Sequence, residues 1–454
     1  MHVHFIAIGG SAMHNLAIAL HKKGFIVTGS DDEIQEPSRT RLKNLNLLPE
    51  REGWFPENVS NKLDAVILGM HARADNPELL KAKELGLKIF SYPEYLYEQS
   101  KDKTRVVIGG SHGKTTITAM ILHVLNFHNT NFDYMVGAQL EGFDTMVKLS
   151  HDAPVIILEG DEYLSSPIDR RPKFHLYHPQ IALLSGIAWD HINVFPTFEN
   201  YTEQFKIFID LIEEGGKLIY CENDTEVKRL AETAGNKISK IPYGIPRYEI
   251  KNGVTSLLSP NSKLITDLLI FGEHNLMNLN GARLVCNQVG VSDEKFYSAI
   301  SSFKGASKRL ELVNKNDSVA VYKDFAHSPS KLKATIQAVK QQFEGRKIIA
   351  CMELHTFSSL NEDFLDQYKG AMDEADEAIV YYNPHTIEHK KLKPISAEQV
   401  KESFGRNDLI VFTDISEMRN HLVKTRKENS VLLMMSSGNF DGMDLKVLAK
   451  EFLN

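Results

Sequence analysis

Cysteine is scarce in this sequence, with three residues among 454, at Cys221, Cys286 and Cys351. Their wide spacing excludes a disulfide framework and any C-x-x-C metal site. The chain also has no apolar run of about 18 residues, the length a membrane helix needs, and its N-terminus shows no basic leader with a cleavage site. We therefore expect a cytoplasmic protein that does not enter a membrane.

Positive charge is not in excess either. Lysine and arginine number 52 against 59 acidic residues, which gives a formal net charge of -7. Nucleic acids and anionic membranes attract basic surfaces, so this balance argues against both as partners. The 42% hydrophobic and 24% charged residues are typical of a globular protein. At roughly 150 residues per domain, the length predicts about three domains.

The strongest positive feature is a glycine-rich turn between an apolar strand and a helix, where residues 105–116 read RVVIGGSHGKTT. Glycines let backbone amides converge on a phosphate, the helix N-terminus adds partial positive charge, and Lys114 adds a full one. The strict phosphate-binding pattern G-x-x-x-x-G-K-[ST] has glycine at the position where this chain has Ile108. The alternative interpretation is therefore a strand-to-helix turn whose glycines are needed only for backbone geometry. We predict a nucleotide phosphate site formed by Gly110, Ser111, His112, Gly113, Lys114, Thr115 and Thr116.

Two more residues are candidates for a metal site beside this turn. The strand predicted at 154–158 ends at Glu159, and the strand predicted at 181–185 is followed by His191. Carboxyl ends of parallel strands meet at one edge of a sheet, and Mg²⁺ bridging to phosphate takes few protein oxygens. We place Glu159 and His191 around Mg²⁺ together with the Thr115 hydroxyl. The alternatives are a solvated acidic turn for Glu159 and a structural role for His191.

The N-terminal region predicts a first nucleotide-binding unit. A short strand, a turn at Gly9, Gly10 and Ser11, and an amphipathic helix follow one another, and the next strand leads to Asp31. A carboxylate at a strand end can accept hydrogen bonds from a ribose or a base. The pattern G-x-G-x-x-G is incomplete because His14 stands where the third glycine belongs. A single nucleotide or a UDP-sugar is therefore favoured over a dinucleotide cofactor.

The last third of the chain alternates strands with helices, which predicts a second parallel sheet with helices on both faces. Upstream of it, Asn275 and Asn278 lie three residues apart near the start of a predicted helix, suited to contact a base or to cap the helix. The stretch 303–310 looks like a hinge. The predicted strands are 319–322, 347–352, 377–381, 409–412 and 431–435.

Several motifs occur in one order along essentially the whole chain and together resemble the Mur ligase family. They are Ile8-Gly-Gly10 with Met13, Gly110-Ser-His-Gly-Lys-Thr-Thr116, Glu159-x-Asp-Glu162, Asp190-His191, Gly272-x-His-Asn-x-x-Asn278, Lys308-Arg309 and Asp324-Phe-Ala-His327. The resemblance implies an α/β fold of three domains. Residues 1–102 would form a Rossmann-like domain for a UDP-muramoyl substrate, 103–305 a central P-loop ATPase-like domain, and 306–454 a Rossmann-like domain for the amino acid or peptide.

The resemblance also implies a reaction of cell-wall peptidoglycan synthesis, in which ATP activates a carboxylate as an acyl phosphate that an amine then attacks. Lys114 and Arg309 would contact phosphates, and Asp324 would bind the ribose or orient Arg309. Asn275 and Asn278 would approach the adenine. The UDP-substrate would be bound by Gly9, Gly10, Ser11, Asp31 and His71, and the incoming peptide by His327, His355 and Ser358.

The amine substrate divides the family branch that acts on UDP-N-acetylmuramate. One activity adds L-alanine, and another joins a recovered tripeptide, L-Ala-γ-D-Glu-meso-diaminopimelate, in cell-wall recycling. The alanine ligases carry a His-Arg-x-x-Arg segment, whereas residues 353–360 here read ELHTFSSL, without arginine. We prefer the tripeptide, with L-alanine as the alternative. Departures from the recycling ligases are the missing Arg near His355 and Ser328 in place of a second His.

Two other function classes fit less well. A nucleotide-regulated binding module would have no need of Glu159, His191 and Arg309 together. A nicotinamide dehydrogenase would need the missing third glycine. Some members of the family place a carbamylated lysine under a second metal, and Phe205 stands at that position here, with Lys206 next to it.

Overall fold

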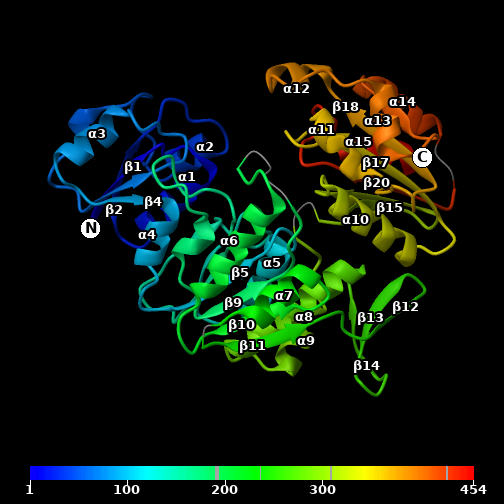
Figure 1. Ribbon diagram of the computed structural model, residues 1–454, viewed down its shortest axis with the longest axis horizontal. Coiled ribbons are helices and arrows are strands. Elements are labelled where there is room, and N and C mark those ends of the chain that lie inside the picture. The colour runs from blue at the N-terminus through cyan, green and yellow to red at the C-terminus, as the bar shows by residue number, and fades with distance from the viewer. Residues whose placement is uncertain (190–193, 236, 307–308, 426–427, 454) are drawn as a thin grey trace. The chain divides into compact units, whose positions relative to one another are not determined.

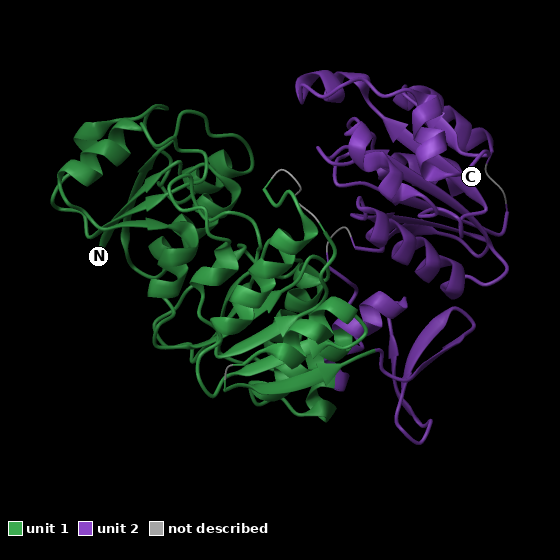
Figure 2. Ribbon diagram, viewed as in Figure 1, with its two compact units in different colours: residues 1–244, 279–296 green, residues 245–278, 297–454 purple. Residues whose placement is uncertain are grey.

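The computed structural model describes residues 1–189, 194–235, 237–306, 309–425 and 428–453. The chain forms two compact units (Figure 2). Unit 1 contains residues 1–244 and 279–296, and unit 2 contains residues 245–278 and 297–454. Within the described ranges, no helix has both the length and the apolar character needed to cross a bilayer.

Unit 1 begins with a four-stranded parallel sheet in the order β2-β1-β3-β4 (Figure 1). Its central strands are almost wholly buried, and β3 is entirely apolar, as is typical of parallel sheets covered by helices. This is the predicted N-terminal Rossmann-like sheet. The elements are β1 (His2–Ile6), α1 (Ser11–Lys22), β2 (Ile26–Ser30), α2 (Ser38–Lys43), β3 (Ala65–Leu68), α3 (Pro77–Glu84), β4 (Ile89–Ser91) and α4 (Tyr92–Glu98).

The second sheet of unit 1 has seven strands in the order β11-β10-β9-β5-β8-β6-β7, all parallel except β7. Its register places Ile108 of β5 opposite Glu159 of β8, so the ends of the two strands are level. The elements are β5 (Thr104–Gly109), α5 (Lys114–Phe127), β6 (Asp133–Met135), β7 (Val147–Lys148), β8 (Val155–Glu159), β9 (Ile181–Leu184), α6 (Phe198–Asp210), β10 (Lys217–Cys221), α7 (Thr225–Thr233) and β11 (Ser239–Tyr243). Helices α8 (Glu273–Gln288) and α9 (Asp293–Ile300) are each divided between the two units.

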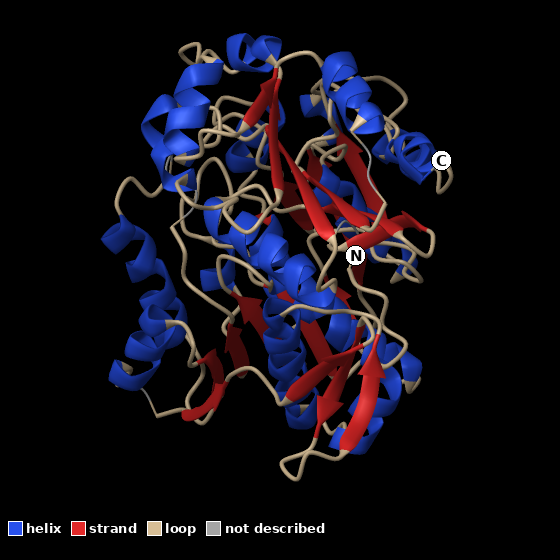
Figure 3. Ribbon diagram, turned by 90° about the vertical axis from the view of Figure 1, so that its right-hand side faces the viewer, coloured by secondary structure: helices blue, strands red, loops and turns tan. Residues whose placement is uncertain are grey.

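Unit 2 contains a six-stranded sheet in the order β15-β16-β20-β17-β18-β19. Figure 3 distinguishes the strands of the chain, in red, from its helices, in blue. Alternate residues of β17 pack into two different apolar clusters, so both faces are covered as predicted. The edge strand β15 runs antiparallel, which differs from the expected parallel sheet. The elements are β15 (Glu311–Lys315), β16 (Val319–Asp324), α10 (Pro329–Gln342), β17 (Lys347–Leu354), α11 (Glu362–Leu365), β18 (Glu377–Tyr382), α12 (Pro384–His389), α13 (Ala397–Phe404), β19 (Ile410–Phe412), α14 (Ile415–Lys424), β20 (Ser430–Met435) and α15 (Leu445–Leu453).

Unit 2 also holds a small antiparallel sheet that the sequence analysis did not predict. It consists of β12 (Tyr248–Lys251), β13 (Val254–Leu258) and β14 (Leu264–Leu268). The α/β architecture expected from the strand and helix pattern is confirmed. The boundaries at 102/103 and 305/306 stay a prediction.

The junction between the two sheets of unit 1 is buried and charged. Lys103 forms an ion pair of 3.0 Å with Asp133, and both side chains are nearly inaccessible. Its ammonium also donates to the carbonyls of Ser150 and Ala153, and Ser150 donates to Asp133. The linker is therefore fixed to the central sheet rather than free to bend.

We expect Lys103→Met to destabilise unit 1, because it leaves the buried Asp133 carboxylate without its cation. Removing one partner of a buried ion pair costs roughly 3–5 kcal/mol, which corresponds to a fall of about 10 °C in Tm. Differential scanning calorimetry measures this change in Tm. The control is Lys206→Met, which breaks an exposed pair with Glu203. It should shift Tm by about 1 °C or less, and an equal shift in both variants would contradict the assignment.

Candidate functional site

The glycine turn after β5 has a shape that only glycines allow. Gly110 has φ +132° and Gly113 has φ +79°. A Cβ on Gly110 would lie 2.1 Å from Ser185 Oγ, so a side chain there is excluded on space as well. Ser111 N donates to the Gly186 carbonyl at 2.9 Å, which ties the turn to the neighbouring strand β9. The turn is thus a fixed concavity at the start of α5.

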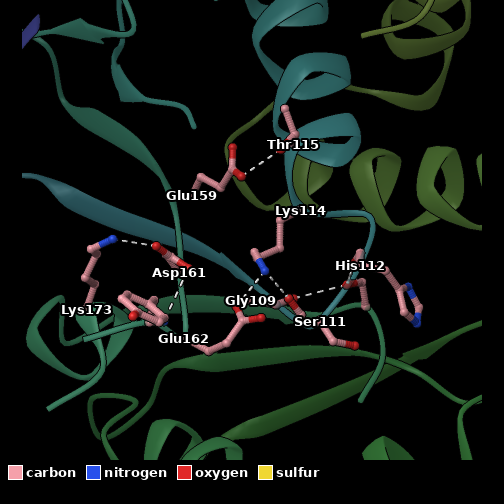
Figure 4. A network of polar contacts seen from close by, with 12 residues as sticks. Gly109, Ser111, His112, Lys114, Thr115, Glu159, Asp161, Glu162 and Lys173 are labelled. Atoms are coloured by element: carbon pink, nitrogen blue, oxygen red, sulfur yellow. Dashed lines mark hydrogen bonds and ion pairs between the residues drawn. The ribbon is translucent and has the colours of Figure 1, made fainter. Parts of the chain in front are cut away.

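Lys114 is the cation of this concavity (Figure 4). Its ammonium lies 2.5 Å from Glu162 Oε2 and 2.6 Å from the Gly110 carbonyl. Burial lowers the pKa of Lys114, but the carboxylates around it, Glu162 foremost, outweigh burial and raise the pKa above its ordinary value. Tyr201 donates to the other oxygen of Glu162 at 3.1 Å. The lysine is therefore charged and held beside the turn.

Glu159 lies beside the first turn of α5, as predicted from the strand order. Its Oε1 accepts from the Thr115 hydroxyl at 2.7 Å, and its Oε2 accepts from Gly137 N at 2.8 Å. Burial raises the pKa of Glu159, although these two hydrogen bonds and Lys114 oppose the shift. A carboxylate and a hydroxyl side by side next to a phosphate concavity fit Mg²⁺, which takes few protein ligands and completes its shell with phosphate and water.

The described residues contain no group of three or more His, Cys, Asp or Glu side chains arranged to hold a metal ion. Two protein oxygens are enough for a phosphate-bound Mg²⁺, so this finding leaves the prediction for Thr115 and Glu159 open. His191 lies outside the described residues, and its place in the metal shell remains a prediction.

Two acidic residues next to Glu159 were not given roles in the sequence analysis. Glu162 pairs with Lys114, and Asp161 pairs with Lys173 at 2.6 Å. Burial acts to raise the pKa of Asp161, but the charges of Lys173 and Lys114 outweigh it and bring the pKa down to about 2. The run EGDE at residues 159–162 shows these carboxylates in the sequence. The lysines with which they pair are determined by the path of the chain after β8.

The N-terminal candidate site is organised by Asp31. Its carboxylate accepts from Gly9 N at 2.7 Å, and a Cβ on Gly9 would come within 2.9 Å of the same oxygen. Burial raises the pKa of Asp31 to about 6, against the opposing hydrogen bond from Gly9. Gly10 precedes α1, and Ser11 and His71 are exposed. The structure thus brings Asp31 and the turn together. Among the residues that the structure describes, no hydrogen bond or ion pair joins His71 to either.

The predicted adenine residues lie on the first turns of α8. Asn275 and Asn278 are both buried, and Asn275 Nδ2 donates to the Phe271 carbonyl at 2.9 Å. Asp324 at the end of β16 accepts from Leu310 N at 2.7 Å and from Ala326 N at 2.7 Å. It therefore fixes the backbone directly after Arg309.

Arg309 and the predicted peptide residues all belong to unit 2. The Arg309 guanidinium lies over the Phe325 ring, 4.4 Å from its centroid, and His327 Nδ1 is 2.7 Å from the Phe325 carbonyl. His355 follows β17 and lies 3.7 Å from the buried carboxylate of Glu353.

Glu353 also accepts hydrogen bonds from Ser436 Oγ and from Phe440 N, the latter at 2.8 Å. Ser358 lies in the same loop as His355 and is partly buried. The hydrogen bonds of Glu353, in β17, with Ser436 and Phe440, which follow β20, join the carboxyl ends of the two strands.

Phe205 occupies an aromatic cluster. It is fully buried, and its ring packs edge-on against Phe174 and Tyr201. The adjacent Lys206 is half exposed and pairs with Glu203. Aromatic packing therefore stands at the position for which the family resemblance implies a carbamylated lysine in some members.

Comparisons with known proteins match the whole chain. The Mur ligase family catalytic domain matches residues 2–104, the Mur ligase middle domain 108–286, and the Mur ligase glutamate ligase domain 308–438. The UDP-N-acetylmuramate--L-alanine ligase of Sulfurihydrogenibium sp. (strain YO3AOP1) is 30% identical over 447 residues, which cover 96% of this chain and 95% of that relative.

Two solved structures share the fold at lower identity. The murein peptide ligase from Psychrobacter arcticus 273-4 has a TM-score of 0.65 and 22% identity, with coverage of 100% of this chain and 99% of that one. The UDP-N-acetylmuramate-alanine ligase from Thermotoga maritima has a TM-score of 0.69 and 20% identity, with coverage of 100% and 98%.

We expect Lys114→Met to reduce turnover of ATP at least about 100-fold, roughly 3 kcal/mol, because the charge that meets the phosphate is lost. It should also lower Tm, since Glu162 is left buried without its cation. The double variant Lys114→Met/Glu162→Gln removes both charges, so its Tm should recover while turnover stays lost. Turnover within a few-fold of wild type in the double variant would refute the phosphate contact.

We expect binding of UDP-N-acetylmuramate to weaken as pH falls through about 6, where Asp31 gains a proton. The folded protein holds this proton more tightly than the unfolded chain, whose pKa is near 3.8, so the stability from Asp31 is lost as pH rises from about 4 to about 6. Asp31→Asn should thus keep or raise Tm at pH 7.5 while weakening binding about 10-fold.

Titration calorimetry between pH 5 and 8 measures the affinity. The control Asp32→Asn should retain the pH dependence with a lower midpoint, because Asp32 contributes to raising the pKa of Asp31. A pH-independent affinity in the wild type would exclude Asp31 from the site.

Proposed function

The chain belongs to the Mur ligase family, the ATP-dependent amide-forming ligases of peptidoglycan synthesis, and we propose that its acceptor is UDP-N-acetylmuramate. The fixed glycine concavity with Lys114 at its edge and Glu159 beside Thr115 supports the ATP-dependent activation, and the names of the curated relatives support the acceptor. The chemistry needs charge neutralisation and alignment more than a protein nucleophile. These side chains supply both.

Each residue has a task that follows from its position. Lys114 neutralises charge on the phosphates, and the Gly110 to Gly113 turn shapes the backbone around them. Thr115 and Glu159 would hold Mg²⁺, which supplies positive charge between the phosphate oxygens. In the N-terminal sheet, Asp31 and the turn from Gly9 would hold the nucleotide part of the acceptor.

For the amine, we favour the tripeptide L-Ala-γ-D-Glu-meso-diaminopimelate. A small amino acid buries little area, so its carboxylate is best gripped by bidentate arginine. The loop that follows β17, residues 355–361, contains none. Arg346 precedes β17, and eight strand residues separate it from this loop by roughly 26 Å, well beyond the reach of an arginine side chain.

The second candidate is free L-alanine, and the names of the curated relatives favour it. Relatives of 27–30% identity over nearly the full chain are named UDP-N-acetylmuramate--L-alanine ligase. Solved structures that share the fold include names of both kinds. The observation that favours the tripeptide instead is the absence of arginine from the loop after β17, residues 355–361.

Side-by-side kinetics with the two amines distinguish the candidates. We expect kcat/KM for the tripeptide to exceed that for L-alanine by at least about 100-fold, a difference of roughly 2.7 kcal/mol in transition-state binding. Omitting UDP-N-acetylmuramate is the control and should abolish amide formation with either amine. Equal or greater efficiency with L-alanine would make the chain an alanine-adding ligase.

A further inference from the structure

A buried polar network lies directly under the turn at residues 9–11. Its members are His14, where the dinucleotide pattern has glycine, and Asn15, which are 1% and 0% exposed. His14 Nδ1 lies 3.0 Å from the Gly10 carbonyl, and Asn15 Nδ2 donates to the Ser11 carbonyl at 2.8 Å. The two side chains also contact each other at 3.0 Å. These contacts fix the Gly10 and Ser11 carbonyls of the turn.

The same network reaches out of the N-terminal sheet to a loop of the central one. This loop, residues 137–146, is called here the brace loop. Asn15 Oδ1 accepts from Met146 N at 3.0 Å, and Arg41 donates to Gln139 Oε1 at 2.9 Å. Arg41 also lies 3.5 Å from Asn15 Oδ1. All of these residues belong to unit 1.

The other end of the brace loop touches the candidate metal carboxylate. Gly137 N donates to Glu159 Oε2, and a Cβ on Gly137 would lie 2.8 Å from Glu159 Oε1. The loop is therefore in close contact with Glu159. A shift of its backbone by about 1 Å would lengthen the Gly137 hydrogen bond beyond its useful range and change where the carboxylate points.

The brace loop is cross-linked within itself, so a shift at one end is carried to the other. Gln139 Nε2 donates to the Phe143 carbonyl, and Tyr134 donates to the Thr145 carbonyl at 3.0 Å. Val136 N and the Met146 carbonyl, at the two ends of the loop, are hydrogen-bonded at 2.9 Å. These hydrogen bonds connect the Gly137 end of the loop to the Met146 end.

We propose that Asn15, Arg41 and Gln139 are positioning residues that couple the turn at residues 9–11 to Glu159 through the brace loop. A nucleotide-sugar held by the turn then strengthens binding of an Mg²⁺-nucleotide at Lys114, and the reverse holds by thermodynamic linkage. The proposal rests on the proposed function for the identity of the nucleotide-sugar, UDP-N-acetylmuramate. It goes beyond that function by making the two sites interdependent.

The test is a pair of calorimetric titrations with ADP and Mg²⁺, one without and one with saturating UDP-N-acetylmuramate. The coupling ratio is the affinity for ADP with UDP-N-acetylmuramate divided by the affinity for ADP without it. In the wild type we expect a ratio of at least about 5, which is the lower end of ordinary coupling between sites. In Gln139→Leu and Arg41→Met the ratio should fall to about 1, while each ligand alone binds within about 3-fold of wild type. Both side chains are partly exposed, so these variants should keep the wild-type Tm.

The matched control is Lys22→Ala. Lys22 and Asp144 form another contact between the N-terminal sheet region and the brace loop, at 3.5 Å, but their side chains are 50% and 90% exposed. This variant should keep the wild-type coupling ratio, because exposed pairs contribute little. Glu159→Gln is the positive control and should lower the Mg²⁺ dependence of ADP binding directly.

Each other outcome has a definite meaning. A wild-type ratio near 1, or wild-type ratios in both Gln139→Leu and Arg41→Met, would overturn the coupling. Loss of nucleotide-sugar binding in those variants with an unchanged ratio would make them direct ligand contacts and also overturn it. If the wild type binds no UDP-N-acetylmuramate, the proposed acceptor is wrong. The coupling is then tested by repeating the two ADP titrations with saturating UDP in place of UDP-N-acetylmuramate, and an ADP affinity in the wild type that UDP leaves unchanged refutes it.

Discussion

The candidate site depends on keeping one ammonium charged where little water reaches it. Lys114 stays a cation because Glu162, Asp161 and Glu159 surround it, and Lys173 in turn balances Asp161. A triphosphate has the same sign of charge as these carboxylates. Binding of a triphosphate at the predicted site would require Lys114 to exchange Glu162 for a phosphate oxygen and a further cation beside Glu159. The predicted Mg²⁺ would meet this charge balance as well as use the two ligand oxygens.

The part of this site that could be predicted from sequence is local or set by strand order. The glycine turn, Lys114 and Thr115 are adjacent in the chain, and Glu159 ends a strand that pairs with β5. Glu162 could not be assigned to Lys114, because the two are 48 residues apart and meet only through the path of the chain after β8. The same holds for the Gly137 amide, since a backbone N–H leaves no mark in a sequence pattern.

The fold shows a similar division. Buried parallel strands read as apolar runs between helices, so both large sheets could be predicted from the pattern. The antiparallel sheet β12 to β14 was missed because its strands mix polar and apolar residues and are largely half-buried or exposed. Strand β15 has the same mixed pattern on the edge of its sheet. Pairing of such strands is decided by tertiary contacts that periodicity does not record.

The candidate residues are divided between the two units. The turn at Gly9, the phosphate loop and Glu159 belong to unit 1, in which contacts such as that of Asn15 with Met146 connect the N-terminal and central sheets. The predicted ATP contacts Arg309, Asn275 and Asn278 belong to unit 2. The loop after β17 belongs to unit 2. In the proposed function, changes in that loop would alter the amine that is accepted while Lys114, Thr115 and Glu159 stay the same.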